Sequence, residues 1–217
     1  ITKEVLMNAI MFDMAVAGST NAVLHILSYA YELGIKLTLA DFEKYAKEIP
    51  CINAVVPSGP YTVVDFHYAG GVMNVMKMLE SKLYTDVPSM YGNTWADMLS
   101  RVKAQENKVI HSLEKPLFNE PGLKILRGNL SPNGAIVRPT AVYDEVKYMK
   151  GKAKVFEGDR PAFEAIMAGE IVPGDIIVIR YEGCKGAPGM KELMLSIDAL
   201  IGLGLDKSVG LISDARF

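Results

Sequence analysis

The sequence predicts a mixed α/β protein, and three observations lead to this class. Half of the 217 residues are hydrophobic, which excludes a disordered or fibrous chain. Up to residue 115 the apolar residues recur at helical spacing, whereas the later residues form short β-branched runs between turns and helices. The loop 116–122 therefore marks the expected boundary between two domains, 1–115 and 116–217.

Helical periodicity and end signals define the elements of the first half. Gly34 is a typical helix-ending residue, and Thr38 and Thr94 each precede an aspartate by three residues, as in a capping box. Gly70 and Gly71 indicate close packing or a break, because a glycine costs about 1 kcal/mol relative to alanine inside a helix. The expected helices cover residues 6–14, 22–33, 39–47, 66–81 and 95–104.

Turn signals and β-branched runs define the second half. The stretch 132–134 (PNG) is typical of a turn between two short strands. Residues 176–179 are four branched residues without alternation, a pattern that predicts a strand covered on both faces. Asp159 is the expected N-cap of a helix that Gly169 ends. The expected strands cover residues 124–127, 135–138, 153–156, 176–179 and 209–212, and the expected helices cover residues 160–167 and 189–200.

Composition narrows the range of partners. With 23 basic and 25 acidic residues the chain has a net charge of −2, too little positive charge for a nucleic-acid or anionic-membrane surface. It contains no apolar run of about 18 residues that would span a bilayer. The two cysteines, Cys51 and Cys184, cannot build a disulfide framework, and no export signal opens the chain. We therefore expect a cytoplasmic protein with reduced thiols that binds neither nucleic acid nor a membrane.

The first candidate site is the loop 181–192, which carries a glycine at every third position between a strand and a helix. Backbone N–H groups at such a helix start, near Gly186 and Gly189, can bind a carboxylate or phosphate. A tight turn that needs small residues explains the same pattern, and the loop matches no nucleotide-binding motif. Glu192, expected in the first helical turn, either complements the helix dipole or offers an oxygen to Mg²⁺.

The second candidate site is the break between the first two expected helices. Ser19, Thr20 and Asn21 place three small polar groups there, which could hydrogen-bond a substrate. Helix capping is the alternative, since these residue types are the preferred N-caps. The histidines lack metal-ligand spacing, and no serine or cysteine has a visible base partner for a hydrolase triad.

Six stretches in the chain, taken together, resemble the dihydroxy-acid dehydratase and phosphogluconate dehydratase family. They occur in the family's order and are spread over almost the whole chain. The stretches are 17–25 (AGSTNAVLH), 65–71 (DFHYAGG), 126–134 (LRGNLSPNG), 153–157 (AKVFE), 182–192 (EGCKGAPGMKE) and 211–217 (LISDARF).

The resemblance implies an iron–sulfur and Mg²⁺-dependent hydro-lyase that converts a vicinal dihydroxy acid into an α-keto acid through an enol. The cluster would act as a Lewis acid on the departing hydroxyl, and Mg²⁺ would hold the substrate carboxylate and the neighbouring hydroxyl. Glu192 matches the family's C-terminal metal ligand in G-x-P-G-M-x-E. Ser19, Thr20, Asn21, Gly186 and Gly189 are the expected substrate-binding residues.

The family's proton-abstracting serine follows the motif D-[GA]-R-[FLM], which places it just after Phe217. The cluster cysteines and the other metal ligands are expected upstream of Ile1, and neither cysteine of this chain matches a cluster position. We therefore expect an internal piece of a longer protein, with no catalytic residue of its own and no activity alone. Residues 1–115 would be the helical remainder of an N-terminal α/β domain. Residues 116–217 would be most of a C-terminal swivelling β-barrel-like domain, in a homodimer or a dimer of dimers.

Sub-family features point in two directions. Residues 179–183 resemble the branched-chain biosynthetic enzymes, whereas residues 213–216 resemble sugar-acid dehydratases. Ala17 and Ala187 stand where the family has glycine, and Cys184 stands where it has proline. We expect dihydroxy-acid dehydratase chemistry, with aldonate or phosphogluconate dehydration as the alternative. A non-catalytic scaffold that keeps the fold is the alternative from another class.

Overall fold

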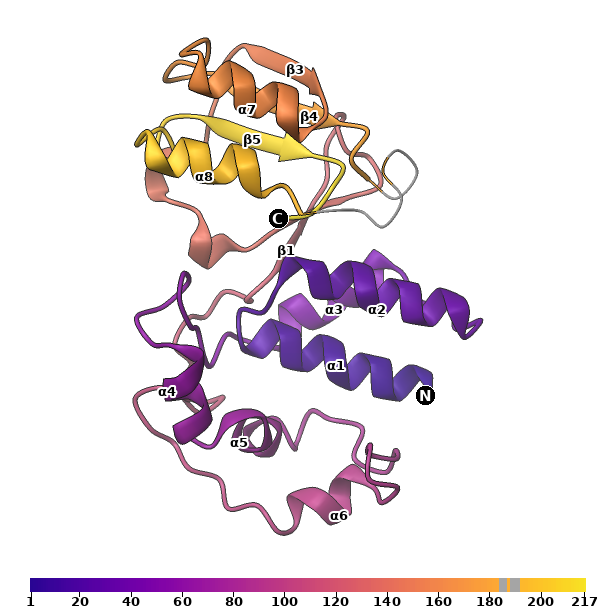
Figure 1. Ribbon diagram of the computed structural model, residues 1–217. Helices are drawn as coiled ribbons and strands as arrows, with labels where there is room; N and C mark the ends of the chain where they lie inside the picture. Colours follow the sequence, from indigo (N-terminus) through magenta and orange to yellow (C-terminus); the bar gives the residue numbers. More distant parts are fainter. Residues whose placement is uncertain (184–186, 188–191) are drawn as a thin grey trace. The chain divides into compact units, whose positions relative to one another are not determined.

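The computed structural model describes residues 1–183, 187 and 192–217, which form two compact units, Ile1–Ala141 and Val142–Phe217 (Figure 1). Helices, one antiparallel sheet and one parallel sheet occur together, which confirms the mixed α/β class. The expected domain limits at residues 115 and 116 stay a prediction. Among the described residues, no helix combines the length and the apolar character needed to cross a bilayer.

Six α-helices of the described residues build the first unit, and local sequence signals fix their starts. The side chains of Thr2, Ser19, Thr62 and Thr94 each accept a hydrogen bond from a backbone N–H of the first helical turn. Thr38 and Asp41 form the predicted capping box. The helices are α1 (Lys3–Ala15), α2 (Thr20–Glu32), α3 (Leu39–Glu48), α4 (Val63–Tyr68), α5 (Gly71–Met78) and α6 (Trp95–Leu99).

Two helices of the first unit are shorter than predicted. The expected helix 66–81 is divided at Gly70, whose φ of 102° is a conformation that glycine adopts readily. The expected helix 95–104 was wrong beyond Leu99. Asn74 captures the backbone of Gln105 instead, donating to its O at 2.8 Å and accepting from its N at 3.0 Å. This tertiary contact outweighs the local helical preference of the segment.

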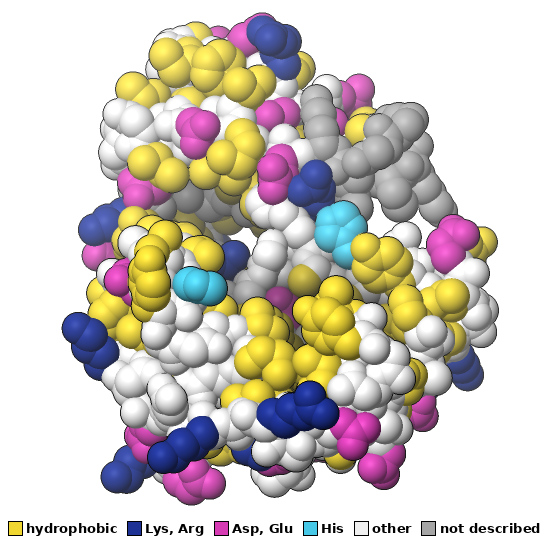
Figure 2. All heavy atoms as spheres, turned by 60° about the horizontal axis from the view of Figure 1, so that its bottom comes forward, with side chains coloured by type: hydrophobic (Ala, Val, Ile, Leu, Met, Phe, Trp, Pro, Cys, Tyr) yellow, Lys and Arg dark blue, Asp and Glu magenta, His cyan; other side chains and the backbone are white. Residues whose placement is uncertain are grey.

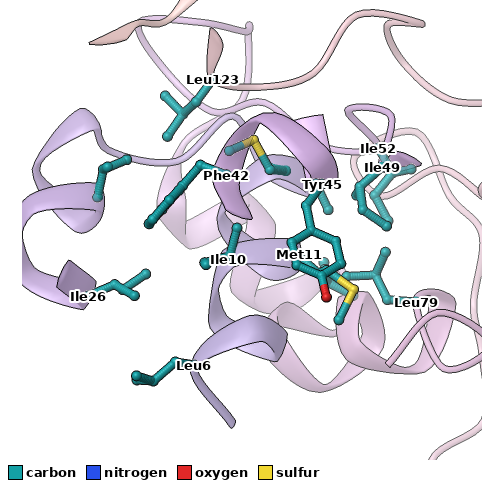
Figure 3. Close-up of a cluster of buried hydrophobic side chains, with 14 of the residues drawn as sticks. Leu6, Ile10, Met11, Ile26, Phe42, Tyr45, Ile49, Ile52, Leu79 and Leu123 are labelled. Carbon is teal, nitrogen blue, oxygen red and sulfur yellow. The ribbon is translucent and has the colours of Figure 1, made fainter. Parts of the chain in front are cut away.

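A large hydrophobic core, with a small separate cluster of Ala17, Cys51 and Ala54, holds the first unit together. Phe42, Ile10 and Met11 are almost fully buried, and Figure 3 shows them between α1 and α3 with Tyr45 beside them. The antiparallel strands β1 (Lys124–Leu126) and β2 (Ala135–Val137) add Ile125 and Ile136 to this core. Figure 2 shows basic, acidic and hydrophobic side chains on the surface of the described residues.

The second unit is a parallel three-stranded sheet with two crossover helices. Its strands have the order β3-β4-β5, and Figure 1 shows both helices on the same face of the sheet. Ile177 and Ile179 of the central strand are buried against Ile166 and Leu200 of these helices. The elements are β3 (Ala153–Glu157), α7 (Asp159–Met167), β4 (Ile176–Arg180), α8 (Met194–Gly202) and β5 (Gly210–Ser213).

The second face of this sheet departs from the sequence prediction. Ile176 and Val178 on β4 are only half-buried, and Val155 and Ile212 on the flanking strands are 54% and 39% exposed. The prediction that this strand is covered on both faces was therefore wrong for the described residues. The four branched residues reflect the β-propensity of a central parallel strand rather than burial of both of its sides.

Candidate functional site

The turn between α1 and α2 carries the first group of predicted site residues, and its backbone is strained and firmly held. Ala17 has a φ of 46°, which is uncommon for a residue other than glycine. Four hydrogen bonds hold the turn: Gly18 N to Asp13 O at 3.0 Å, Ile52 N and Asn53 N to Ala15 O at 2.8 and 3.1 Å, and Gly122 N to Met14 O at 3.0 Å. Strain that the surroundings maintain in this way is typical of functional sites.

Ser19, Thr20 and Asn21 start α2, directly after this turn. Ser19 is the N-cap, and its Oγ accepts from Asn21 N at 3.1 Å, so the capping alternative applies to this residue. Thr20 and Asn21 are the first two helical residues and are half-buried. The first backbone N–H groups of a helix of this length favour a nearby anion. The roles of Ser19, Thr20 and Asn21 in substrate binding stay a prediction.

A polar cluster next to the turn was missed by the sequence analysis. Asp13, in the last turn of α1, is 7% exposed, and its Oδ1 lies only 1.9 Å from where a Cβ on Gly18 would stand. Burial raises the pKa of Asp13 to about 7, and the positive charge of Arg138 opposes this rise. Arg138 follows β2 and donates from Nη1 to Ser58 Oγ at 3.2 Å. An aspartate within the apolar stripe of the first helix was the available signal.

The second group of predicted site residues follows β4 in the other unit. Tyr181, directly after the strand, has a φ of 67°, so both non-glycine residues with positive φ in the described chain lie in predicted site segments. Glu182 is buried, and its Oε1 accepts from Asp159 N at 2.9 Å. Glu182 N donates to Asp214 Oδ1 at 3.2 Å, which ties the loop start to the C-terminal stretch. Gly186, Gly189 and Cys184 lie outside the described residues.

The sequence predicted Glu192 in the first turn of α8, and this was wrong, because that helix begins two residues later, at Met194. Glu192 pairs instead in a short parallel bridge with Arg216, where Leu193 N donates to Arg216 O at 3.1 Å. Arg216 Nη1 lies 3.1 Å from Glu192 Oε1, and the Glu192 side chain is 44% exposed. The structure thus brings together two stretches that the family resemblance assigns to one active site.

The donor set for a metal is incomplete in the described residues. Within 1–183, 187 and 192–217, no three His, Cys, Asp or Glu side chains gather closely enough to hold an ion. Glu192 has the right chemistry for one ligand, because Mg²⁺ prefers carboxylate oxygens and this side chain is accessible.

Comparisons with known proteins identify the family of the chain. The sequence profile described as Dihydroxy-acid/6-phosphogluconate dehydratase N-terminal matches residues 1–98, and its C-terminal counterpart matches residues 108–217. Proteins named dihydroxy-acid dehydratase are similar over the chain: that of Clostridium novyi is 45% identical, that of Methanosarcina barkeri 44% and that of Geobacter sulfurreducens 42%. These alignments cover 100%, 97% and 100% of this chain but 40%, 39% and 39% of the relatives. The chain therefore belongs to the dihydroxy-acid/6-phosphogluconate dehydratase family.

Proposed function

We propose that the full protein containing this chain is a hydro-lyase that dehydrates a 2,3-dihydroxy carboxylic acid to the corresponding 2-keto acid. The observation that carries this proposal is the contact between Glu192 and Arg216, which joins the carboxylate stretch 182–192 to the C-terminal stretch 211–217. The relatives named dihydroxy-acid dehydratase support a dihydroxy acid as the substrate, and residues 179–183 favour a branched-chain one. The 213–216 stretch favours a sugar acid as the second candidate.

The mechanism assigns binding and orientation to the residues of this chain. An iron–sulfur cluster and Mg²⁺, when bound, supply the Lewis acidity that helps a hydroxide leave and stabilises charge on the substrate oxygens. Glu192 would offer one carboxylate oxygen to the Mg²⁺, and Arg216, 3.1 Å away, would orient that carboxylate. Ser19, Thr20 and Asn21 hydrogen-bond substrate oxygens at the start of α2. The substrate loses a proton from C2 and a hydroxide from C3, and the resulting enol tautomerises to the keto acid, with one water released in total.

The chain alone is proposed to be inactive, because it spans about two fifths of the length of the relatives it matches. The proton-abstracting serine is expected after Phe217, and the cluster cysteines are expected before Ile1. The full protein is expected to be cytoplasmic and to form a homodimer or a dimer of dimers, which light scattering would measure. A gene without those cysteines or without that serine would instead favour the non-catalytic scaffold.

Turnover by the full-length protein tests the proposal. Protein prepared anaerobically with iron, sulfide and Mg²⁺ should be brown and should form a keto acid from 2,3-dihydroxyisovalerate or D-gluconate. The preferred substrate then decides between the branched-chain and the sugar-acid alternatives. Folded, colourless protein that is inactive on both acids would contradict the proposal and favour the scaffold.

The substitution Glu192→Gln tests the ligand assignment. The amide is a weaker metal ligand, so we expect kcat to fall by at least about 100-fold and the Mg²⁺ concentration for half-maximal activity to rise, without loss of the fold. Glu164→Gln is the matched control, since Glu164 is 63% exposed on α7 and pairs only with Arg160 among the described residues. Turnover of Glu192→Gln within tenfold of wild type, a barrier change of about 1.4 kcal/mol, would rule out Glu192 as a ligand.

A further inference from the structure

Arg138 has hydrogen-bonding capacity that the described residues leave unused. Its guanidinium carries five N–H donors, but its one hydrogen bond within the described chain goes from Nη1 to Ser58 Oγ. Among those residues no carboxylate lies within ion-pair distance of it, although the side chain is half-buried. Burial lowers the pKa of Arg138, yet an arginine stays charged at neutral pH. A cation held in this way favours an anion that can pair with its planar fork.

Two buried oxygens near Arg138 also lack partners. Asp13 Oδ2 is buried without a hydrogen bond, and so is the hydroxyl of Thr140, two residues beyond Arg138. The charges of Asp13 and Arg138 influence each other's pKa, but the two groups are not in salt-bridge contact. Buried polar atoms are nearly always hydrogen-bonded, so such a group needs a ligand or a water to complete it.

One of these unpartnered groups, the Asp13 carboxyl, lies beside a predicted substrate segment. The Asp13 carboxyl packs directly against Gly18, where any side chain would collide with its Oδ1. Ser58, which holds Arg138, is itself buried and follows another short turn. Asp13 from α1 therefore lies directly beside the turn before α2, and Arg138, held by Ser58, is close enough for its charge to act on Asp13.

We propose that Asp13 and Arg138 form a binding site for a hydroxylated carboxylic acid beside the turn that precedes Ser19. The Arg138 guanidinium pairs with the ligand carboxylate, and the Asp13 carboxyl hydrogen-bonds one of the ligand hydroxyls. The raised pKa of Asp13 agrees with this role, because a protonated carboxyl does not repel the anion and can donate to it. The class of ligand rests on the proposed function, but the binding itself requires neither the cluster nor Mg²⁺.

Calorimetric titration of the full-length protein, prepared without iron and sulfide and kept in EDTA, tests this site. The probes are D-gluconate and 2,3-dihydroxyisovalerate, with isovalerate as the carboxylate that lacks hydroxyls and mannitol as the polyol that lacks a carboxylate. We expect at least one hydroxy acid to bind at least tenfold more tightly than isovalerate, and mannitol to give no measurable binding.

Arginine substitutions show whether Arg138 is responsible. Arg138→Gln should weaken binding of the hydroxy acid at least tenfold, whereas Arg127→Gln should leave it within twofold. Arg127 is a matched control because it lies in the same unit and its charge is already paired with Glu43 at 2.8 Å. If Arg138→Gln does not fold by circular dichroism, Arg138→Lys and Arg127→Lys replace the pair, with an expected loss of at least threefold for the former alone.

The results separate this site from the dehydratase proposal. The site would be overturned if the wild type bound neither hydroxy acid, or if Arg138→Gln and Arg127→Gln weakened binding equally. The unused hydrogen-bonding groups of Asp13 and Arg138 would then be completed only by water. Arg138-dependent binding in a protein that never forms a keto acid would overturn the dehydratase proposal and keep the site. Formation of a keto acid by a protein whose ligand binding does not depend on Arg138 would support the dehydratase proposal and overturn the Asp13 and Arg138 site.

Discussion

At the scale of single residues, Asp13 shows how burial makes one carboxyl sensitive to pH. Its pKa rises from an ordinary 3.8 to about 7 in the folded chain, because desolvation outweighs the attraction of Arg138. Between these two pH values the folded chain keeps a proton that the unfolded chain has released. The stabilising contribution of this proton is therefore complete below pH 3.8 and is lost as the pH rises through about 7.

The substitution Asp13→Asn removes this titration. We expect the free energy of unfolding of the variant minus that of wild type to increase by about 2–3 kcal/mol from pH 5 to pH 8, because only the wild type loses stability as Asp13 ionises. Urea unfolding of both proteins across that range measures the difference. Asp86→Asn serves as the control for the loss of one carboxylate, because Asp86 is an exposed aspartate of the same unit. A difference independent of pH would show that Asp13 is ionised in the folded chain throughout.

Glycine at position 122 is required by close packing. A Cβ there would stand 2.4 Å from Ala17 Cα and 2.6 Å from both Ala17 N and Met14 O, and backbone atoms cannot move aside easily. Gly122→Ala should therefore destabilise the chain by about 2–3 kcal/mol and displace the turn before Ser19. Gly128→Ala is the matched control, since a Cβ at Gly128 meets nothing within 4 Å. Equal melting temperatures for the two variants would contradict the tight contact.

At the scale of elements, a buried hydrogen-bond network joins the two helices of the second unit. Asp159, the first residue of α7, is 3% exposed, and its Oδ1 accepts from Ser196 N at 3.2 Å and from Ser196 Oγ at 2.5 Å. Gly158, rather than the predicted Asp159, is the N-cap of α7. Asp159 therefore acts mainly as an acceptor for α8, and Glu182 completes the network at Asp159 N.

Removing this acceptor should loosen the packing of α7 against α8. We expect Asp159→Ala to lower the free energy of unfolding by about 1–3 kcal/mol, because Ser196 N loses its acceptor and Ser196 Oγ keeps only the backbone O of residue 159. The control, Asp198→Ala on the exposed side of α8, should change it by about 0.5 kcal/mol or less. Chemical denaturation of the three proteins gives both values. A decrease in the free energy of unfolding of less than about 1 kcal/mol for Asp159→Ala would show that a water molecule replaces the Asp159 carboxylate as the acceptor.

At the scale of the whole molecule, the sequence predicted what local chemistry controls. The helices at α2 and α3, the turn between β1 and β2 and the central strand β4 all follow from capping residues, glycine stops and β-branched runs. These signals act over a few residues, so one sequence suffices to find them. Motif resemblance also identified the family, which the matched profiles confirm.

What the sequence did not predict depends on contacts between distant residues. The early end of α6 follows from Asn74 binding Gln105, and the position of Glu192 follows from its bridge to Arg216. The Asp13 and Arg138 cluster combines residues that are far apart in the chain, and no spacing rule relates them. The substrate-binding roles of Ser19, Thr20 and Asn21 stay a prediction, because the local contacts of these residues, such as the N-cap hydrogen bond of Ser19, do not distinguish capping from binding.

The anchoring of the Ala17 turn has a consequence for protein synthesis. Its backbone is held by Ile52 and by Gly122, which leave the ribosome long after α1 and α2 have emerged. A nascent chain that stalls before Gly122 can form both helices, but it lacks the last partner that fixes the left-handed residue between them. The ribosome must therefore translate Gly122 before the turn at Ala17 becomes rigid. Nascent chains arrested before Gly122 should be cleaved at this turn by proteases that do not cleave the complete chain.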